Sequence, residues 1–144
     1  MYYSSLGSSP MISKADMDGN NQQVIANLSS VTYYTFLDIV LDKVSKRLFF
    51  SDQTNGVIKY IDLTNHEIHT LISGNLHSPT GLALFKDTLY WTATGEGQFT
   101  GVVFKANLSD GAVAKAQVDG LGEPSGIYAH NSKTSQVPGN QNII

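Results

Sequence analysis

Acidic side chains offer the most obvious chemistry in this 144-residue chain, because six aspartates recur at equivalent places in it. Carboxylates that converge in one channel could bind Ca²⁺, a cation that prefers oxygen ligands. However, Asp16 and Asp62 occupy the place that Asn107 takes in a third segment, near the ends of predicted strands. Because aspartate commonly caps turns there, we interpret these carboxylates as turn residues, with a calcium site as the alternative. The six are Asp16, Asp18, Asp38, Asp42, Asp52 and Asp62.

Histidine is the other side chain here that could bind a metal or change its charge near neutral pH. Only His66 and His69 are close together, three residues apart, and such positions on a strand point to opposite faces. Two diverging imidazoles cannot both reach one zinc ion at about 2 Å, so we expect polar surface residues. Because histidine titrates at about pH 6.5, a pH-dependent role stays open for these residues. The four histidines are His66, His69, His77 and His130.

Several other functions find little support in the composition. The chain has no cysteine, which excludes disulfides, thiolate metal sites and cysteine nucleophiles. The glycine-rich segment 95–101 lacks the lysine and following helix of a phosphate-binding loop, and no Gly-x-Ser-x-Gly motif marks a hydrolase. A net charge of −3 without a cluster of Lys or Arg argues against nucleic acid. We expect no cofactor and no catalytic residues.

The sequence also shows no pattern typical of a membrane-spanning segment or an export signal. No apolar run approaches the roughly 20 residues of a membrane-spanning helix. Residues 1–10 have neither the basic start nor the apolar stretch of a signal peptide. The sequence therefore predicts no membrane insertion and no signal peptide in this chain.

A five-residue phrase that occurs three times organises the chain. Residues 1–5, 48–52 and 89–93 each run apolar, aromatic, aromatic, hydroxyl, then small or acidic. A repeat of about 40–50 residues indicates a repeat architecture. The residues that define the phrase are Tyr2, Tyr3, Phe49, Phe50, Asp52, Tyr90, Trp91 and Thr92.

Each repeat contains four short apolar runs, which we name strands a to d. No window shows a helical period, and Gly, Asn, Asp or Pro bounds each run, so the pattern predicts strands and turns. Strand a is apolar on nearly every residue, as expected of a strand buried on both faces. Strand b carries the phrase, and strand d is polar like an outer edge. The pairs at residues 18–19, 64–65 and 110–111 tolerate positive φ, which predicts antiparallel c–d hairpins.

Four antiparallel strands per repeat, apolar inside and polar outside, predict the blade of a β-propeller. The order is b-c-d, then a-b-c-d twice, then a lone strand a at residues 125–129, which makes three blades. We assign residues 1–130 to the propeller repeats and 131–144 to an irregular tail.

The chain resembles the YWTD repeats of low-density-lipoprotein-receptor-type β-propellers. The matching residues are Tyr90-Trp91-Thr92, Phe49-Phe50-Ser51-Asp52, and segments 12–19 and 79–84. The resemblance implies a six-bladed, extracellular propeller that binds proteins and is not an enzyme. The family's phrase usually ends in Asp, which only Asp52 keeps, while Ser5 and Ala93 replace it. The family's flanking Cys-rich modules are also missing, and the repeat count is three instead of six.

Aromatic residues in the connecting loops are the candidate ligand contacts. In a propeller the b–c and d–a loops share one face, and exposed aromatics there suit a protein partner. Each aromatic could equally seal a blade junction. The residues that we assign to this face are Tyr33, Tyr34, His77, Glu96 and Phe99.

Two segments fit the sequence for N-glycosylation, Asn-x-Ser/Thr. They begin at Asn27, in a predicted loop, and at Asn107, at the end of a predicted strand c. They have meaning only if the protein is secreted.

Three blades are half of a six-bladed ring, and half a ring leaves two apolar blade faces exposed to water. Two copies related by a twofold axis would supply six blades, so we expect a homodimer or else a fragment of a larger receptor. The sequence thus favours a non-catalytic module that binds a protein or glycan through its loop face. A calcium-dependent propeller hydrolase is the alternative from the enzyme class.

Overall fold

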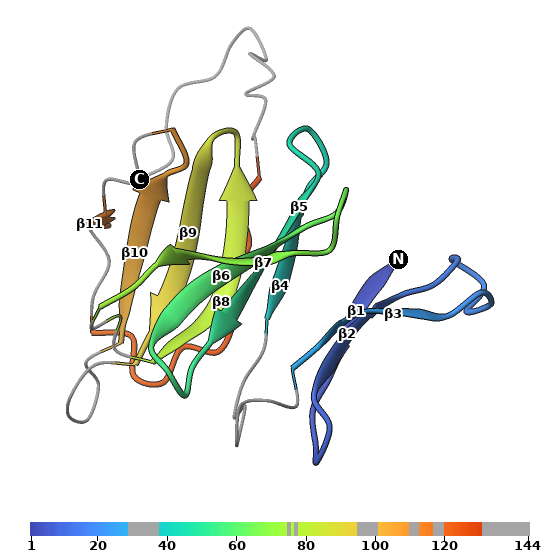
Figure 1. The fold of residues 1–144 in the computed structure, drawn as a ribbon. Coiled ribbons are helices and arrows are strands. Elements are labelled where there is room, and N and C mark those ends of the chain that lie inside the picture. The colour runs from blue at the N-terminus through green and yellow to red at the C-terminus, as the bar shows by residue number, and fades with distance from the viewer. Residues whose placement is uncertain are drawn as a thin grey trace, which may run out of the picture.

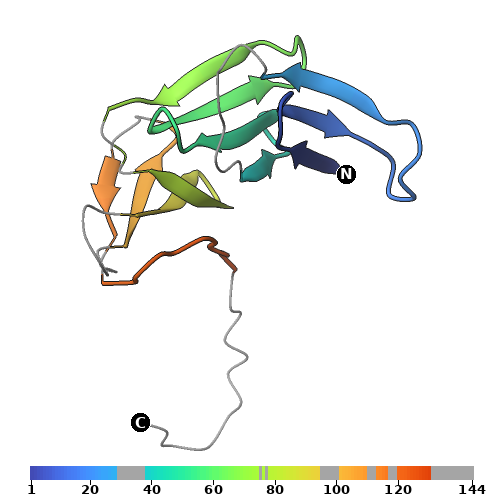
Figure 2. The same ribbon diagram turned by 90° about the horizontal axis from the view of Figure 1, so that it is seen from below.

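Runs of β-branched and aromatic residues form strands, and turn residues reverse the chain between them (Figure 1). A computed structural model describes residues 1–28, 38–74, 76, 78–94, 101–109, 113–116 and 120–130. Within these residues, eleven strands form three antiparallel sheets and no helix occurs. The sheets follow one another along an arc (Figure 2). The predicted all-β fold class is confirmed, with one sheet for each copy of the repeat.

Consecutive strands pair in chain order within each sheet, so each sheet runs from an inner to an outer strand. In the second and third sheets, the first strand is the predicted strand a, whereas the first sheet begins with strand b. The first sheet contains β1 (Tyr2–Ser5), β2 (Met11–Lys14) and β3 (Gln23–Asn27). The second contains β4 (Ile39–Asp42), β5 (Arg47–Asp52), β6 (Val57–Asp62) and β7 (Ile68–Ile72). The third contains β8 (Pro79–Phe85), β9 (Thr88–Ala93), β10 (Val102–Asn107) and β11 (Val113–Lys115).

The pairing register repeats from sheet to sheet. Phe50 lies opposite Lys59 in the second sheet, just as Trp91 lies opposite Phe104 in the third. The β2–β3 and β6–β7 pairs each shift register at the same place of the repeat. Such bulges bend and twist a strand, so the outer strands of both sheets turn in the same way. The sheets are copies of one unit in their backbone as well as in their sequence.

The c–d turns confirm the antiparallel hairpins and correct one detail. Gly19 has a positive φ of 87°, as predicted. In the second turn the residue with positive φ is His66, at 63°. The prediction of positive φ at Thr64-Asn65 was therefore wrong. The reversal comes later because the carboxylate that ends β6 first caps the turn. The third predicted pair, at residues 110–111, lies outside the described residues.

Two layers of apolar side chains join the three sheets. On β5, Leu48 and Phe50 pack toward the first sheet, against Ile12, whereas Phe49 packs toward the third sheet, near Trp91. All five side chains are almost fully buried. A blade between two neighbours is buried on both faces, which explains why residues 48–50 of β5 are continuously apolar instead of alternating.

Residues 125–129 do not form the predicted lone strand a, so that prediction was wrong. A strand needs a hydrogen-bonded neighbour, and no described strand pairs with this segment. The segment lies along β8 instead. The two backbones are so close that a Cβ built on Gly81 would be 2.5 Å from the Gly126 Cα atom. In addition, the Thr80 hydroxyl donates to the Pro124 carbonyl at 2.7 Å. The segment thus takes the position of a next inner strand without becoming one.

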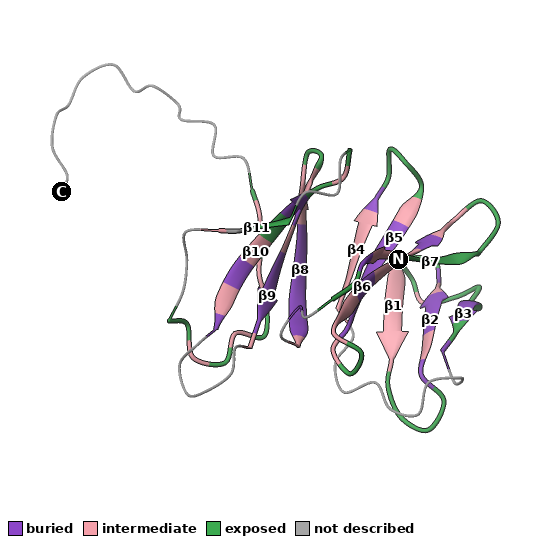
Figure 3. Cartoon of the chain, turned by 60° about the vertical axis from the view of Figure 1, so that its left-hand side comes forward, coloured by how far each residue is buried: buried purple, intermediate pink, exposed green. Residues whose placement is uncertain are grey.

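The inner strands β4 and β8 differ in burial (Figure 3). Most of β8 is buried, whereas residues 39–41 of β4 are only half-buried. The strand β8 lies between β4 and the segment around Gly126. In contrast, β4 faces a first sheet that has no strand a among the described residues. The prediction of burial on both faces is therefore confirmed for β8 and wrong for β4, while β7 is exposed as predicted.

Candidate functional site

The hydroxyl of the repeated phrase connects neighbouring blades. Ser51 Oγ accepts the N–H of Asp38 at 3.0 Å and donates to the carbonyl of Thr80 at 2.9 Å. Thr92 takes the equivalent place in the third sheet, where its hydroxyl accepts the N–H of Gly81 at 2.9 Å. Both hydroxyl residues are buried, and an unsatisfied buried polar group costs about 1–3 kcal/mol. These hydroxyls therefore position strand a of their own blade, and Ser51 also holds that of the next blade.

Asp38 makes a second connection between the second and third sheets. Its Oδ1 atom accepts the N–H of Ile39 at 2.9 Å, and its Oδ2 atom accepts the N–H of Leu82 on β8 at 2.6 Å. Glycine occupies the equivalent place in the next two units, at Gly81 and Gly126. The carboxylate of Asp38 is thus a structural bond between blades, and a carboxylate link of this kind is specific to this junction.

Asp52, the one aspartate that ends a phrase, is fully buried. It accepts hydrogen bonds from the backbone and side chain of Asn55 and forms an ion pair with Lys59 at 2.9 Å. In the third sheet, Ala93 and Phe104 take the places of Asp52 and Lys59, and Phe104 stacks on the neighbouring tryptophan. Aromatic packing in the third blade therefore takes the place of the hydrogen bonds and ion pair that Asp52 makes in the second.

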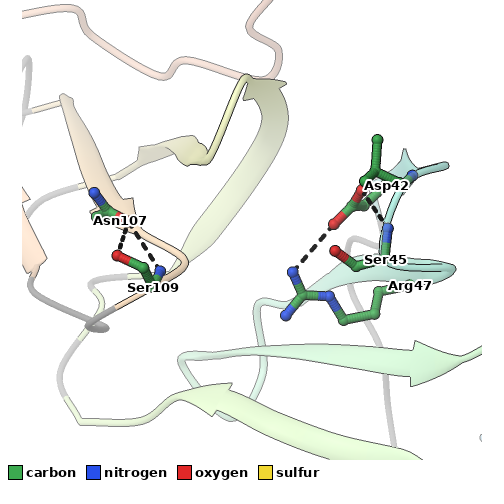
Figure 4. Close-up of polar contacts among 6 residues, drawn as sticks. Asp42, Ser45, Arg47, Asn107 and Ser109 are labelled. Carbon is green, nitrogen blue, oxygen red and sulfur yellow. Dashed lines mark hydrogen bonds and ion pairs between the residues drawn. The ribbon is translucent and has the colours of Figure 1, made fainter.

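Other carboxylates accept hydrogen bonds within their own turns, as the turn interpretation expected. Asp42 accepts the N–H groups of Val44 and Ser45, each at 3.1 Å, and pairs with Arg47 (Figure 4). Burial opposes ionisation of Asp42, but the bonds from Ser45 and Arg47 outweigh it and hold the pKa below the ordinary 3.8. Asp62 accepts the hydroxyl and N–H of Thr64, which lower its pKa. Among the described residues, no three acidic or histidine side chains gather as a metal site.

The described histidines lie in three separate settings. His66 is in the β6–β7 turn and donates its N–H to the Asp62 carbonyl at 2.8 Å. His69 stacks on Tyr60 with ring centroids 5.0 Å apart, while His130 stacks on Tyr128 at 6.1 Å. These three side chains are exposed, which agrees with the interpretation as surface residues.

The predicted ligand contacts fall outside the described residues, whereas both predicted glycosylation asparagines lie within them. Asn27 ends β3 and Asn107 ends β10, and both are exposed. The ligand contacts of the predicted face therefore remain predictions, and they are Tyr33, Tyr34, His77, Glu96 and Phe99.

Sequence reasoning missed a hollow of about 350 Å³ beside the third sheet. Tyr90 and Phe85 line one side of it, and residues 127–130 line the other. Tyr90 has the place in the third sheet that Phe49 has in the second, and Phe49 packs against the next blade. That equivalence was a usable signal that Tyr90 faces the position of a further blade.

Comparison with known proteins identifies the repeat. Residues 46–86, from the start of β5 through β8, match the family described as low-density lipoprotein receptor repeat class B. The match begins at strand b and ends with the next strand a, so the family repeat is offset from the blade by one strand. Among the described residues no helix has the length and apolarity needed to cross a membrane.

Two curated relatives from fruit flies resemble part of the chain. The vitellogenin receptor Yl of Drosophila melanogaster is 30% identical over 92 residues, 64% of this chain. Protein cueball of Drosophila yakuba is 33% identical over 86 residues, 58% of this chain. The matches cover only 4% and 13% of those two proteins.

Two solved structures share the fold. A chain in the crystal structure of a nidogen/laminin complex superimposes with a TM-score of 0.67 at 18% identity, covering 87% of this chain and 46% of that one. TolB from Acinetobacter baumannii gives 0.62 at 15% identity, covering 79% and 29%. Residues 46–86 are therefore similar to a low-density lipoprotein receptor class B repeat, and the chain has a β-propeller fold.

Proposed function

We propose that this chain is part of a non-catalytic β-propeller recognition module that binds a protein partner in a secreted or cell-surface setting. The observation that carries the proposal is the class B repeat at residues 46–86, in a fold shared with a chain of the nidogen/laminin complex. The matched relative named as a receptor supports the same kind of activity. The alternative is a calcium-dependent hydrolase, and the carboxylates give it no support because they bond within their own turns. Stoichiometric calcium binding in a calorimetric titration would favour that alternative.

The partner is expected on the face formed by the b–c and d–a loops. The opposite face has short, closed turns, where Leu63 donates its N–H to the Lys46 carbonyl at 2.9 Å and Leu108 to that of Asp87 at 2.8 Å. The longest connection in the sequence joins the end of β3 to the start of β4, and these strand ends belong to the loop face. Long loops on a rigid scaffold commonly carry binding residues.

Binding to purified laminin, nidogen and vitellogenin tests the proposal, because these are the proteins that the neighbour's and relative's names indicate. We expect saturable binding to one of these proteins. The double variant Tyr34→Ala, Phe99→Ala should lower the affinity at least tenfold. Val44→Ser is the matched control, since Val44 is 95% exposed in the β4–β5 turn of the opposite face. No saturable binding, or equal loss in control and loop variants, would contradict the proposal.

A second copy of the chain is proposed to complete the ring. The first sheet has three described strands where the others have four, and the hollow beside Tyr90 lies where a further blade would pack. Two copies would cover both surfaces with interfaces of the kind already seen between the sheets. Light scattering on the purified chain should therefore give a dimer, and a well-folded monomer of 15.6 kDa would contradict the homodimer.

A further inference from the structure

We propose that Asn107 is an N-glycosylation site whose acceptor geometry is built into the β10–β11 turn. Asn107, Leu108 and Ser109 form the Asn-x-Ser sequence. Asn107 and Ser109 are exposed, while Leu108 is half-buried and packs on the apolar layer between the second and third sheets. The middle residue thus anchors the segment and leaves the two reactive side chains on the surface.

The side chains of Asn107 and Ser109 are in direct contact (Figure 4). Asn107 Oδ1 accepts the Ser109 N–H at 2.9 Å and the Ser109 hydroxyl at 2.8 Å. Both bonds end on the amide oxygen, and the Nδ2 atom takes part in neither of them. A hydroxyl that donates to the amide oxygen withdraws electron density from the amide, which makes the Nδ2 protons more acidic and eases the deprotonation that accompanies modification of the nitrogen.

The equivalent turn of the second sheet shows that this geometry belongs to the repeat. Asp62 Oδ1 accepts the Thr64 N–H at 2.8 Å and the Thr64 hydroxyl at 2.6 Å. The turn therefore forms with either Asp or Asn at its first position. Only Asn has the nitrogen that can be modified, so the third sheet carries the acceptor and the second does not.

The position of the turn is compatible with a bulky glycan. N-linked glycans are surface groups that bring much water-exposed volume, so they need an exposed attachment point. Asn107 lies beside the Asp87 turn, on the face opposite the proposed ligand loops, since Leu108 bonds the Asp87 carbonyl. A glycan there leaves the loop face open to a protein partner.

The reaction needs a lipid-pyrophosphate-linked oligosaccharide as donor. The Asn107 Nδ2 atom forms a bond to the anomeric carbon of the donor sugar, and the bond from that carbon to the phosphate oxygen breaks. The amide nitrogen releases one proton to water, and the lipid pyrophosphate leaves with the bonding electron pair. No oxidant or reductant is required.

The inference rests on the proposed secreted setting, and its test separates the two proposals. The full chain, fused to a cleavable signal peptide, is expressed in cultured animal cells and translated in parallel with microsomes. Site occupancy is read by mass spectrometry after enzymatic removal of N-glycans in heavy-oxygen water. We expect a glycan on Asn107 in both systems and its complete loss in Asn107→Asp, which keeps the turn.

Asp62→Asn is the matched gain-of-site variant, because it creates Asn-Leu-Thr in the equivalent turn. Combined with Asn107→Asp, it should restore one glycan, now in the second sheet. An unoccupied Asn107 in both expression systems would overturn the inference, whichever state Asn27 is in. That result would leave the recognition module intact, because binding to laminin, nidogen or vitellogenin is measured separately.

Discussion

The buried ion pair between Asp52 and Lys59 gives the sharpest test of how the repeat tolerates its own variation. Asp52 is fully buried and its carboxylate lies 2.9 Å from Lys59 Nζ, while the third sheet has Ala93 and Phe104 at the same two places. We predict that Asp52→Ala alone is destabilising, and that adding Lys59→Phe recovers most of the loss. The double variant copies a solution that the chain already uses.

The expected magnitudes follow from burial. Removing one partner of a buried pair costs about 3–5 kcal/mol. The lower end, about 3 kcal/mol, applies here because the Lys59 side chain keeps 20% exposure and Asn55 is exposed, so their donors can bond water. In the double variant the new phenylalanine lies opposite Phe50, where an aromatic pair contributes about 0.5–1.5 kcal/mol. We therefore expect a net loss of about 1 kcal/mol for the double variant.

Urea unfolding measures these free energies through the fluorescence of Trp91. Trp91 is the only tryptophan and is fully buried between the second and third sheets. Lys59→Phe alone, which leaves Asp52 buried without its ion-pair partner, completes the double-mutant cycle and should also cost about 3 kcal/mol. If the double variant loses the sum of the two single losses, the equivalence between the blades is refuted.

Three further predictions concern the blade junctions and turns. Gly81→Ala should destabilise by about 1–3 kcal/mol, because its Cβ would meet Gly126 at 2.5 Å; Gly126→Ala, with open space around it, is the control for urea unfolding. Ser51→Ala should cost about 1–3 kcal/mol by leaving the buried Thr80 carbonyl without the hydroxyl that donates to it and the Asp38 N–H without its acceptor; a loss no larger than that of an exposed serine would argue against the junction. Asp42→Asn should cost more stability at pH 7 than near pH 3. The folded pKa of Asp42 lies below 3.8, so its stabilisation is present above that value and is lost as pH falls through the folded pKa. A constant difference between the two proteins at both pH values would contradict it.

Much of the fold follows from local pattern. The phrase with two aromatics and a hydroxyl marks strand b because alternating side chains must fill two layers at once, and Phe49 and Phe50 do so on opposite faces of β5. The turn role of Asp62 also follows from local chemistry, since its partner Thr64 is two residues away. Such short-range features are readable without knowing how the sheets pack.

The candidate site was less predictable. Asn107 was recognised from its sequence motif, but its contact with the Ser109 hydroxyl depends on the turn that follows β10. The hollow beside Tyr90 could not be recognised from spacing, because a hollow is what remains where packing stops. The placement of His66 at positive φ was missed because capping by the preceding carboxylate moved the turn by one residue.

The sequence by itself determined the repeat, its strand order, its antiparallel hairpins and the class B resemblance, because these depend on residue type and on neighbours a few positions away. Only the tertiary structure decided which residues join the blades. Ser51 bonds the Thr80 carbonyl 29 residues away, and Asp38 bonds the Leu82 N–H 44 residues away. It also decided that residues 125–129 lie along β8 without forming a strand. A strand exists only when a partner satisfies its backbone hydrogen bonds, and whether that partner is present depends on the assembled sheets and not on the segment's own residues.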